Sequence, residues 1–270
     1  VSEFALMANL KHLQLNTNQM TGTLPSELGL LTKMTFLGGK YLLASSTAWV
    51  LPLAHFFSFV LLHLNQLTGT IPMELEALLN LEIFFVEQNF LTGTIPSYFA
   101  QMSALSWFLA NGLLLTGTVP PKLWQHPKLS ALDIASNPGL VGSIPTEIGL
   151  ATALVFFYIK ENDSWSGTIP SEIGLLTGLS DFVAWEANLS GTLPSEIAGL
   201  PNLYALLIDG NPLTGTIPSR MADQQQVTKL HINDTLLTGV IPEALCRVDD
   251  LVFDCPQLCG CDCLCADSSN

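Results

Sequence analysis

Charged residues are scarce in this sequence: only 12% of its 270 residues are Asp, Glu, Lys or Arg, about half of the usual share. Bases are scarcer than acids, with 9 Lys and Arg against 23 Asp and Glu, so the net charge is −14 at pH 7. Nucleic acids and anionic membranes attract basic patches. The charge balance therefore disfavours both as partners.

Cysteine is missing from the first 245 residues. The six cysteines of the tail are Cys246, Cys255, Cys259, Cys261, Cys263 and Cys265. This density predicts a disulfide-stapled cap over the end of the fold, and the spacing leaves the pairing open. A thiolate metal site is the alternative, which we disfavour because no His accompanies the cluster.

A segment reading Thr-Gly-Thr-Ile-Pro, or a close variant, recurs nine times. Its glycines are Gly22, Gly69, Gly93, Gly117, Gly142, Gly167, Gly191, Gly215 and Gly239. They are 24 or 25 residues apart, except for 47 between the first two. Upstream of each glycine, leucines at alternate positions predict a short strand with one buried side. The period indicates a solenoid in which each repeat packs on its neighbours.

The full unit, L-x-x-L-x-L-x-x-N-x-L-x-G-x-I-P-x-x-L-x-x-L, resembles the plant-type leucine-rich repeat. Residues 213–218 (LTGTIP) and 170–175 (PSEIGL) carry it almost letter for letter. The resemblance covers residues 6–245 and implies a right-handed α/β solenoid of nine repeats with a parallel β-sheet on its concave face. Plant proteins of this kind are receptor ectodomains that bind peptides or proteins, or inhibitors of cell-wall-degrading enzymes such as polygalacturonase. We divide the chain into the solenoid, 1–245, and a cysteine-rich tail, 246–270, which resembles the tails of diatom and microalgal leucine-rich-repeat proteins.

One interval departs from the period because it holds an extra hydrophobic segment, 39–61 (GKYLLASSTAWVLPLAHFFSFVL). Deleting this segment joins residues 34–38 to 62–67 and restores a repeat, so we predict an insertion. A degenerate tenth repeat and an unspliced intron are the alternatives. Residues 42–62 carry no charge and are long enough for a membrane span. We disfavour a span because Pro52 and His55 interrupt the run and because it would split the solenoid across a bilayer.

Other positions bear on local structure and on the compartment. Leu113, Ala187 and Thr235 replace the repeat Asn, with Asn111, Asn188 and Asn233 close by, so we expect those turns to be rebuilt. Sequons at Asn162, Asn188 and Asn233 predict glycosylation. Together with the cysteines, they favour an oxidising, extracellular setting. Because residue 1 is valine, we expect a fragment or a processed form.

The residues between the strand leucines are expected to point out of the concave face. In the middle repeats they are apolar: Ile83, Phe85, Trp107, Leu109, Phe156, Tyr158, Val183 and Trp185. A solvent-facing strip of this kind usually marks an interaction site, and Glu87, Asp133, Glu161, Asp181 and Glu186 lie around it. We therefore predict recognition of a protein or peptide with basic and apolar groups. In the alternative, the aromatics pack on one another or against segment 39–61.

The two residues that flank each repeat glycine form a second regular feature, which we call the Thr ladder. It comprises Thr21/Thr23, Thr68/Thr70, Thr92/Thr94, Thr116/Thr118, Ser166/Thr168, Ser190/Thr192 and Thr214/Thr216, with Val141/Ser143 and Val240 as interruptions. On strands about 4.8 Å apart, these side chains make an array of hydroxyls and methyls. Flat Thr arrays occur on ice-binding solenoids, so ice binding is a second hypothesis. A structural cell-surface or cell-wall protein is a third.

Nothing in the sequence predicts catalysis. The five histidines are scattered over different repeats without metal-ligand spacing, and no Ser or Asp falls in a nucleophile motif. We expect no enzyme activity, no cofactor and no bound metal.

Overall fold

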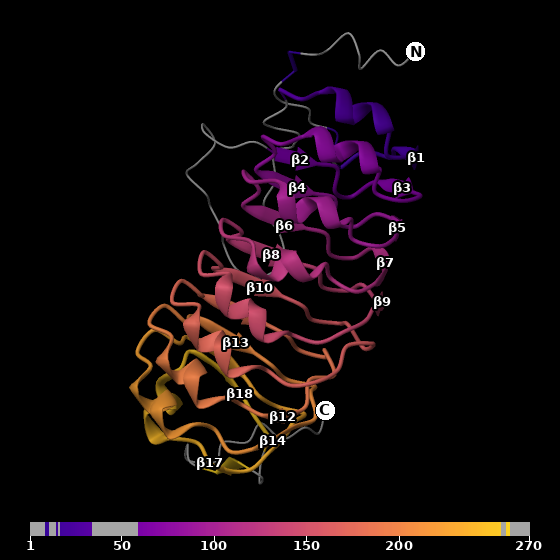
Figure 1. Ribbon diagram of the computed structural model, residues 1–270. Coiled ribbons are helices and arrows are strands. Elements are labelled where there is room, and N and C mark those ends of the chain that lie inside the picture. Colours follow the sequence, from indigo (N-terminus) through magenta and orange to yellow (C-terminus); the bar gives the residue numbers. More distant parts are fainter. Residues whose placement is uncertain (1–8, 11–14, 16, 34–58, 255–257, 260–270) are drawn as a thin grey trace.

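The computed structural model describes residues 9–10, 15, 17–33, 59–254 and 258–259, and it shows an elongated stack of repeats (Figure 1). A typical repeat contributes one strand to a large sheet, then a short second strand, then a 3-10 turn. This arrangement confirms the predicted leucine-rich-repeat solenoid.

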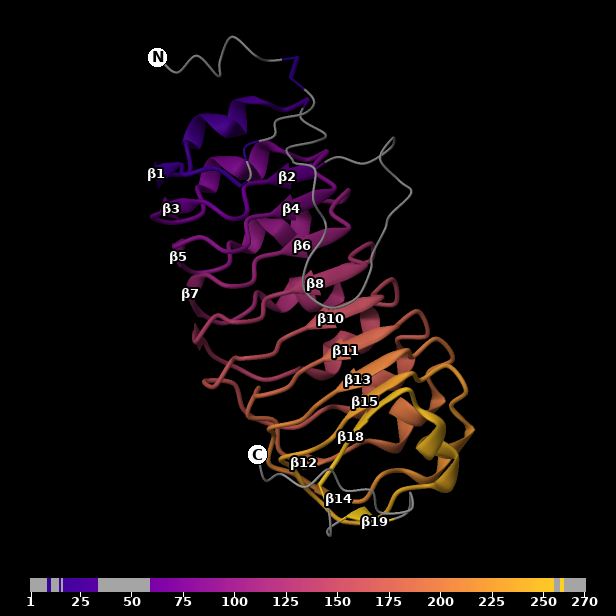
Figure 2. The ribbon, with the colours of Figure 1, turned by 180° about the vertical axis from the view of Figure 1, so that it is seen from behind.

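The large sheet covers the concave face, and Figure 2 shows its strands side by side. Among the described residues it consists of β2 (Phe59–Leu61), β4 (Ile83–Phe85), β6 (Trp107–Leu109), β8 (Ala131–Asp133), β10 (Phe156–Tyr158), β11 (Asp181–Val183), β13 (Ala205–Leu207), β15 (Lys229–His231) and β18 (Asp250–Val252). Every pair is parallel and the order in space follows the order along the chain. Equivalent residues of successive repeats therefore form columns, as in the pair Phe84 and Phe108.

The second strands carry the Thr ladder along one side of the stack. They are β1 (Thr21–Thr23), β3 (Gln66–Thr68), β5 (Thr92–Gly93), β7 (Leu114–Gly117), β9 (Gly139–Leu140), β12 (Gly191–Thr192), β14 (Leu213–Gly215), β16 (Leu236–Leu237), β17 (Gly239–Val240) and β19 (Leu258–Cys259). They pair in four short sheets of two or three strands. These strands are short because each repeat proline, which has no N–H to donate, follows within a few residues.

A 3-10 helix follows the repeat proline on the convex side, and the proline is its N-cap. The helices are η2 (Ser26–Leu30), η3 (Met73–Ala77), η4 (Ser97–Gln101), η5 (Pro121–Gln125), η6 (Thr146–Leu150), η7 (Ser171–Leu175), η8 (Ser195–Gly199), η9 (Ser219–Asp223) and η10 (Glu243–Arg247). Each turn inserts an apolar residue into the core, such as Ile148 or Ile173, which are fully buried.

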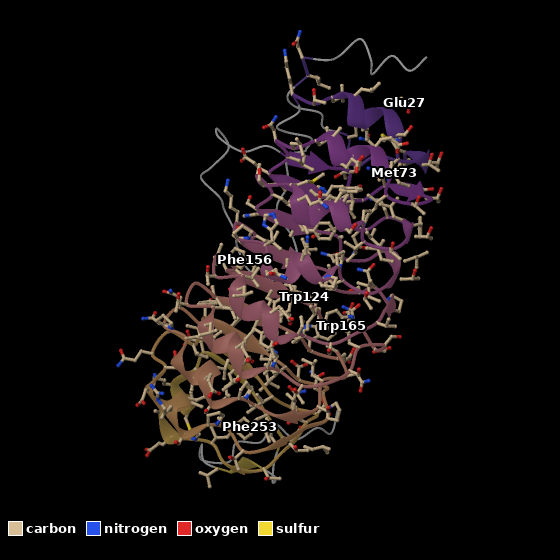
Figure 3. All side chains as sticks on the ribbon, viewed as in Figure 1. Glu27, Met73, Trp124, Phe156, Trp165 and Phe253 are labelled. Atoms are coloured by element: carbon tan, nitrogen blue, oxygen red, sulfur yellow. The ribbon has the colours of Figure 1, made fainter. Side chains whose placement is uncertain are left out.

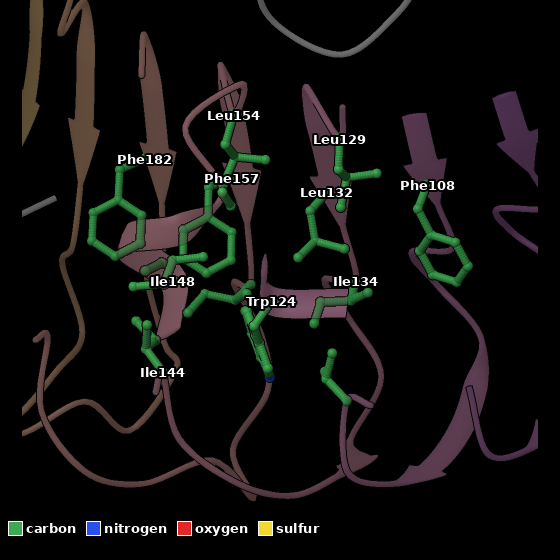
Figure 4. Packing of buried hydrophobic residues seen from close by; sticks show 14 of the residues in the cluster. Phe108, Trp124, Leu129, Leu132, Ile134, Ile144, Ile148, Leu154, Phe157 and Phe182 are labelled. Atoms are coloured by element: carbon green, nitrogen blue, oxygen red, sulfur yellow. The ribbon is translucent and has the colours of Figure 1, made fainter. Parts of the chain in front are cut away.

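The hydrophobic core runs along the described part of the stack between the large sheet and the 3-10 turns. Figure 4 shows its middle section, with Phe108, Phe157 and Phe182 among the packed side chains. Aromatic side chains in one column stack from repeat to repeat, with ring centroids 5.4 Å apart both for Phe84 and Phe108 and for Phe157 and Phe182. Strand pairing joins adjacent repeats, so packing between neighbours supplies most of the stability of the fold. Large rings such as Trp107 and Phe156 also reach across one repeat.

Buried asparagines form a second internal column, the Asn ladder, made of Asn65, Asn89, Asn137, Asn162 and Asn211. Asn137 is representative: its Nδ2 donates to the carbonyls of Ala110 in the preceding repeat (2.9 Å) and Ile134 in its own (3.1 Å). Its Oδ1 accepts from the N–H of Leu115 in the preceding repeat (3.2 Å). The ladder therefore satisfies backbone groups of turns that are shielded from water.

The three repeats without this Asn differ from one another. Leu113 is buried as a core residue. Thr235 keeps part of the pattern, because its Oγ1 donates to the carbonyl of Ile232 (2.8 Å). Beside Ala187, Asn188 has a φ of +49° and donates from Nδ2 to the carbonyl of Trp165 (2.8 Å). The expected rebuilding of the backbone is thus seen at the Ala187 turn, where both Glu186 and Asn188 have a positive φ.

The hydrophobic segment 39–61 lies mostly outside the described residues. Its last three residues form β2, which pairs with β4. This strand occupies the place in the sheet that the predicted repeat gives to residues 34–38, so the solenoid includes 59–61. In the part of the chain that the structure describes, no helix has the length and apolar character that a membrane crossing requires.

Candidate functional site

The eight residues predicted to bind a ligand come from four of five successive repeats on the concave face; the repeat with β8 contributes none of them. Ile83 and Phe85 are on β4, Trp107 and Leu109 on β6, Phe156 and Tyr158 on β10, Val183 on β11, and Trp185 two residues beyond it. Strand pairing aligns them in columns; Ile83 pairs with Trp107, and Tyr158 pairs with Val183. The predicted placement on one face is confirmed.

The expectation that the whole strip faces solvent is wrong for four of the eight. Ile83, Phe85, Leu109 and Val183 are at most 9% exposed. Ile83, Phe85 and Leu109 form a cluster with Ala131, against which Trp107 and Phe156 pack. Large rings on strands this close cover their smaller neighbours. The concave face is therefore partly a second core.

Four aromatic side chains of the predicted set stay half-buried and define the concave aromatic patch: Trp107, Phe156, Tyr158 and Trp185. Trp107 and Phe156 meet edge to face with centroids 6.4 Å apart, and Phe156 lies 6.4 Å from Tyr158. Figure 3 shows the position of Phe156 at the sheet side of the stack. The patch offers rigid rings of the kind that anchor protein ligands.

Trp185 is held by a cation that our reading of the sequence missed. The Nζ of Lys160 lies 4.6 Å from the centroid of the Trp185 ring, within the range of a cation–π contact. The signal was present, because Lys160 and Trp185 are adjacent members of one outward column. This contact fixes the orientation of the indole at the edge of the patch.

Carboxylates lie within the face and not only around it. Asp133, on β8, is 7% exposed; it accepts from Asn111 Nδ2 (2.8 Å) and from the N–H of Ala135 (3.1 Å). Burial raises the pKa of Asp133 to about 6, although these hydrogen bonds and Lys160 oppose the shift. Burial and the charge of Asp133 likewise raise the pKa of Glu87. The hydrogen bonds and positive charge that the protein places near Asp133 and Glu87 therefore do not offset the cost of burying their ionised forms.

A third acid, Asp181, lies at the other side of the patch. Asp181 is 4% exposed and accepts from Ser180 Oγ (2.6 Å). Burial raises its pKa, and hydrogen bonds from Ser180 and from the Tyr158 hydroxyl oppose the shift. Desolvation and the charge of Asp181 raise the pKa of Tyr158 in turn, so the phenol stays a hydrogen-bond donor. Of the other acids that we predicted, Glu161 accepts from Ser136 Oγ and Glu186 is exposed.

The predicted modification sites divide into one correction and two open cases. Asn162 is fully buried and its Nδ2 donates to the carbonyls of Ile134 and Ile159. A glycan on that nitrogen is incompatible with the Asn ladder, so Asn162 is withdrawn as a glycosylation site. Asn188 is exposed and Asn233 is half-buried; both remain predicted glycosylation sites.

Cys246 is disulfide-bonded, and the pairing of the tail stays a prediction because Cys255, Cys261, Cys263 and Cys265 lie outside the described residues.

No cluster of three or more His, Cys, Asp or Glu side chains within the described ranges is arranged to hold a metal ion. His126 is buried against the carbonyl of Met102 (3.2 Å), and His231 faces Asp250 (3.0 Å). His12 and His55 lie outside the described residues. The chemistry that the face offers is noncovalent: stacking, hydrogen bonding and ion pairing.

Comparison with known proteins agrees with this fold. A family described as Leucine Rich Repeat matches residues 9–31, and a search of curated proteins finds no match. The crystal structure of a TDR receptor is 26% identical, with a TM-score of 0.79 over 93% of this chain and 39% of that chain. The plant peptide hormone receptor RGFR1, solved in complex with RGF2, is 26% identical, with a TM-score of 0.74 over 95% of this chain and 41% of that one.

A plant ice-binding protein shares the fold at 22% identity, with a TM-score of 0.64 over 93% of this chain and 81% of that chain. The chain spans about two fifths of the length of the two receptor chains. It is a leucine-rich-repeat solenoid that is similar in structure to plant receptor ectodomains and to an ice-binding protein of plants.

Proposed function

We propose that this chain recognises a protein or peptide outside the cell through the concave face, without catalysing a reaction. The observation that carries the proposal is the concave aromatic patch, because its half-buried rings lie beside carboxylates whose pKa values are raised. The peptide complex of RGFR1, which has the same fold, supports the choice of ligand class.

The chemistry of the face favours a ligand with basic and apolar groups. Ionised Glu87, Asp133 and Asp181 lie where water is largely excluded, and Lys160 is the nearest cation to the first two. A ligand ammonium or guanidinium near these acids would stabilise their charged forms. Apolar ligand side chains would cover Trp107 and Trp185. The net charge of −14 would also accelerate the approach of a cationic ligand.

A peptide-display selection on the immobilised chain tests this proposal. We expect enrichment of sequences that combine Lys or Arg with apolar residues, and binding that weakens at least tenfold in a Tyr158→Ala/Trp185→Ala variant. A matched control is Thr116→Val/Thr118→Val, which changes two exposed residues of the Thr ladder on another side of the stack. Selected peptides that bind the wild type and both variants equally would overturn the proposal.

Ice binding through the Thr ladder is the second candidate, favoured by one observation. Except at Val141, the first side chain of each rung from Thr68 to Thr238 is a Thr or Ser whose hydroxyl donates to the glycine carbonyl of the preceding repeat at 3.2–3.5 Å. The hydroxyls are thus held in one orientation along an exposed face. Ice-affinity partitioning tests the idea: wild type found in the ice fraction, and Thr94→Lys/Thr118→Lys left in the liquid, would support it. Wild type left in the liquid would end it.

The remaining features fit an extracellular protein. We propose that Asn188 and Asn233 carry N-linked glycans and that the tail cysteines are paired in disulfides. Intact-mass analysis of the secreted chain before and after glycosidase and reduction checks both statements. A chain with free thiols and no glycan would contradict them.

A further inference from the structure

The close packing between successive rungs of the Thr ladder is interrupted at one repeat. In most rungs the Thr after the glycine packs its γ-methyl against the next glycine: a Cβ placed on any of six repeat glycines would lie 2.7–3.2 Å from that side chain. On Gly142 it would lie 4.0 Å from Thr118 Cγ2. Gly142 also has the most extended backbone of the nine, with a φ of +135°. The contact between the fourth and fifth rungs is therefore loose.

The sequence explains this opening. Two repeats have 25 residues, and in both the extra residue lies between the Asn ladder and the Thr ladder: N-P-G-L at 137–140 and N-D-S-W at 162–165. The other repeats with this Asn have one residue fewer there, as in Asn89-Phe-Leu91. The longer connection displaces the rung, and Val141 replaces the usual Thr.

A cavity of about 360 Å³ lies at the opening, within the usual range of small-ligand sites. We call it the ladder pocket. The residues that matter for its chemistry are Thr118, Trp124, Val141, Ser143, Glu147 and Trp165. It lies between the Thr ladder and the helices η5 and η6, away from the concave aromatic patch. Figure 3 labels Trp124 and Trp165 in the middle of the stack.

Two tryptophans build the inner wall of the ladder pocket. Trp165 stands where other repeats have a leucine such as Leu140 or Leu189. Trp124 stands where other turns have a small residue such as Gly149. Their rings meet edge to face with centroids 5.9 Å apart, and their exposures are 4% for Trp124 and 1% for Trp165.

Trp165 leaves a hydrogen-bond donor without an acceptor. Its Nε1 is buried and has no partner among the described residues. A buried indole N–H usually finds a partner, and leaving one unpaired costs about 1–3 kcal/mol. The mouth of the pocket presents the opposite polarity, with the exposed carboxylate of Glu147 and the hydroxyls of Thr118 and Ser143.

We propose that the ladder pocket binds one ring of a neutral saccharide. Trp165 Nε1 is closed to water in this structure, so binding requires a small movement of the indole that lets a sugar oxygen supply the missing acceptor. Sugar hydroxyls donate to Glu147. The C–H faces of the ring fit the apolar wall formed by Val119, Val141 and Pro121. A purely apolar ligand would leave the indole N–H unpaired, and an anion would meet Glu147 in a chain of net charge −14.

Titration of the full chain with the methyl glycosides of glucose, galactose, mannose and N-acetylglucosamine tests the proposal. Saturation-transfer NMR detects binding, and tryptophan fluorescence reports changes near Trp124 and Trp165. We expect at least one glycoside to bind the wild type. Its affinity should fall about tenfold in Trp165→Phe, which keeps a ring and removes the N–H, and several-fold in the surface variant Glu147→Gln.

Glu196→Gln, the same change at the equivalent exposed position of another turn, is the matched control and should bind the glycoside as the wild type does. Circular dichroism of each variant establishes that the solenoid is folded. The proposal is overturned if no glycoside binds the wild type, or if Trp165→Phe and Glu147→Gln both bind with unchanged affinity. The peptide selection above is independent of either result, because the concave patch and the ladder pocket share no residue.

Discussion

The concave face and the Thr ladder repeat with the same period. The ladder has nearly the same residues in every repeat, whereas the outward residues of the concave face differ from repeat to repeat. Along the ladder, nearly every rung repeats Thr or Ser around a glycine. On the concave face, the column that contains Trp107 reads Ile, Trp, Ala, Phe and Asp in successive repeats. Both features lie on stacked parallel strands, so the strand geometry alone does not explain the difference.

Packing explains why the ladder is regular. In most rungs a Thr methyl lies over the next glycine and a hydroxyl donates to the preceding glycine carbonyl, so contacts between repeats favour the same residues in successive rungs. The outward positions of the large sheet also pack on one another, as Ile83, Phe85 and Leu109 do, but this packing accepts different residue types in successive repeats. Because its outward residues differ from repeat to repeat, the concave face is suited to a ligand whose side chains vary along its length, such as a peptide. This variation supports the proposal that the concave face is the recognition site.

The largest loss of stability is expected for a substitution in the Asn ladder, which lies inside the stack and supports both faces. Asn211→Ala should lower the free energy of unfolding by about 3 kcal/mol, because Asn211 makes two buried donations, to Ala184 and Ile208, and accepts from Leu189 N–H. Urea denaturation measures the change. Asn202→Ala, which removes one hydrogen bond of an exposed side chain, is the control. Equal losses in the two variants would contradict the importance of the Asn ladder.

The next effect tests whether contacts between repeats fix the ladder. In Gly191→Ala the new Cβ would lie 2.7 Å from Thr168 Cγ2, at a φ of +76°, so we expect a loss of about 2 kcal/mol. In Gly22→Ala, where no atom lies within 4 Å of the Cβ, only the backbone strain remains and the loss should be smaller. Thermal denaturation compares the two. A Gly22→Ala loss as large as that of Gly191→Ala would show that the packing explanation is wrong.

The third effect concerns the acids of the concave face. The folded-state pKa of Asp133 is about 6, above its ordinary 3.8, so its contribution to stability is full below pH 4 and is lost as the pH rises through 6. Asp133→Asn should therefore raise the free energy of unfolding at pH 7 by about 1–2 kcal/mol. The gain should shrink at pH 4. Asp223→Asn, at an exposed position, is the control. A gain that is the same at both pH values would contradict the assigned pKa.

The smallest effect is expected for a ladder hydroxyl. Thr92→Val keeps the shape and removes an exposed donation to Gly69, so stability should change by less than about 0.5 kcal/mol. Differential scanning calorimetry checks this value. A loss near that of Gly191→Ala would mean that the hydroxyls, and not the methyl contacts, maintain the ladder.

Most of the fold could be predicted from the sequence because the 24- to 25-residue repeat determines where each strand and turn lies. The alternating leucines fix which side of each strand is buried, and the aligned repeats fix the columns. The placement of Trp107 beside Ile83 and Ala131 follows from counting residues alone. The strand at 59–61 was missed because deleting 39–61 restores the repeat pattern equally well when residues 34–38 supply the strand.

Exposure within the site could not be predicted by counting. Alternation places Phe85 and Leu109 on the outer side of the sheet, but their burial depends on how rings from neighbouring strands lie across them. The same limit applied to Asn162, where a sequon and a ladder position coincide in one residue. The cation–π contact of Lys160 depends on side-chain conformation, which no repeat pattern specifies.

The Asn ladder also has a direction. Every side-chain hydrogen bond that Asn65, Asn89, Asn137 or Asn211 makes outside its own repeat goes to the repeat that precedes it in the chain. During synthesis, each new repeat therefore brings the side chain that docks it onto repeats that have already emerged. Shortening the chain from its C-terminus leaves the remaining asparagines with their partners, whereas shortening it from the other end removes them. The backbone has the opposite direction: N–H groups such as that of Ile134 donate to the following repeat, so a repeat lost from the C-terminus costs backbone hydrogen bonds but no side-chain bond of the remaining Asn ladder.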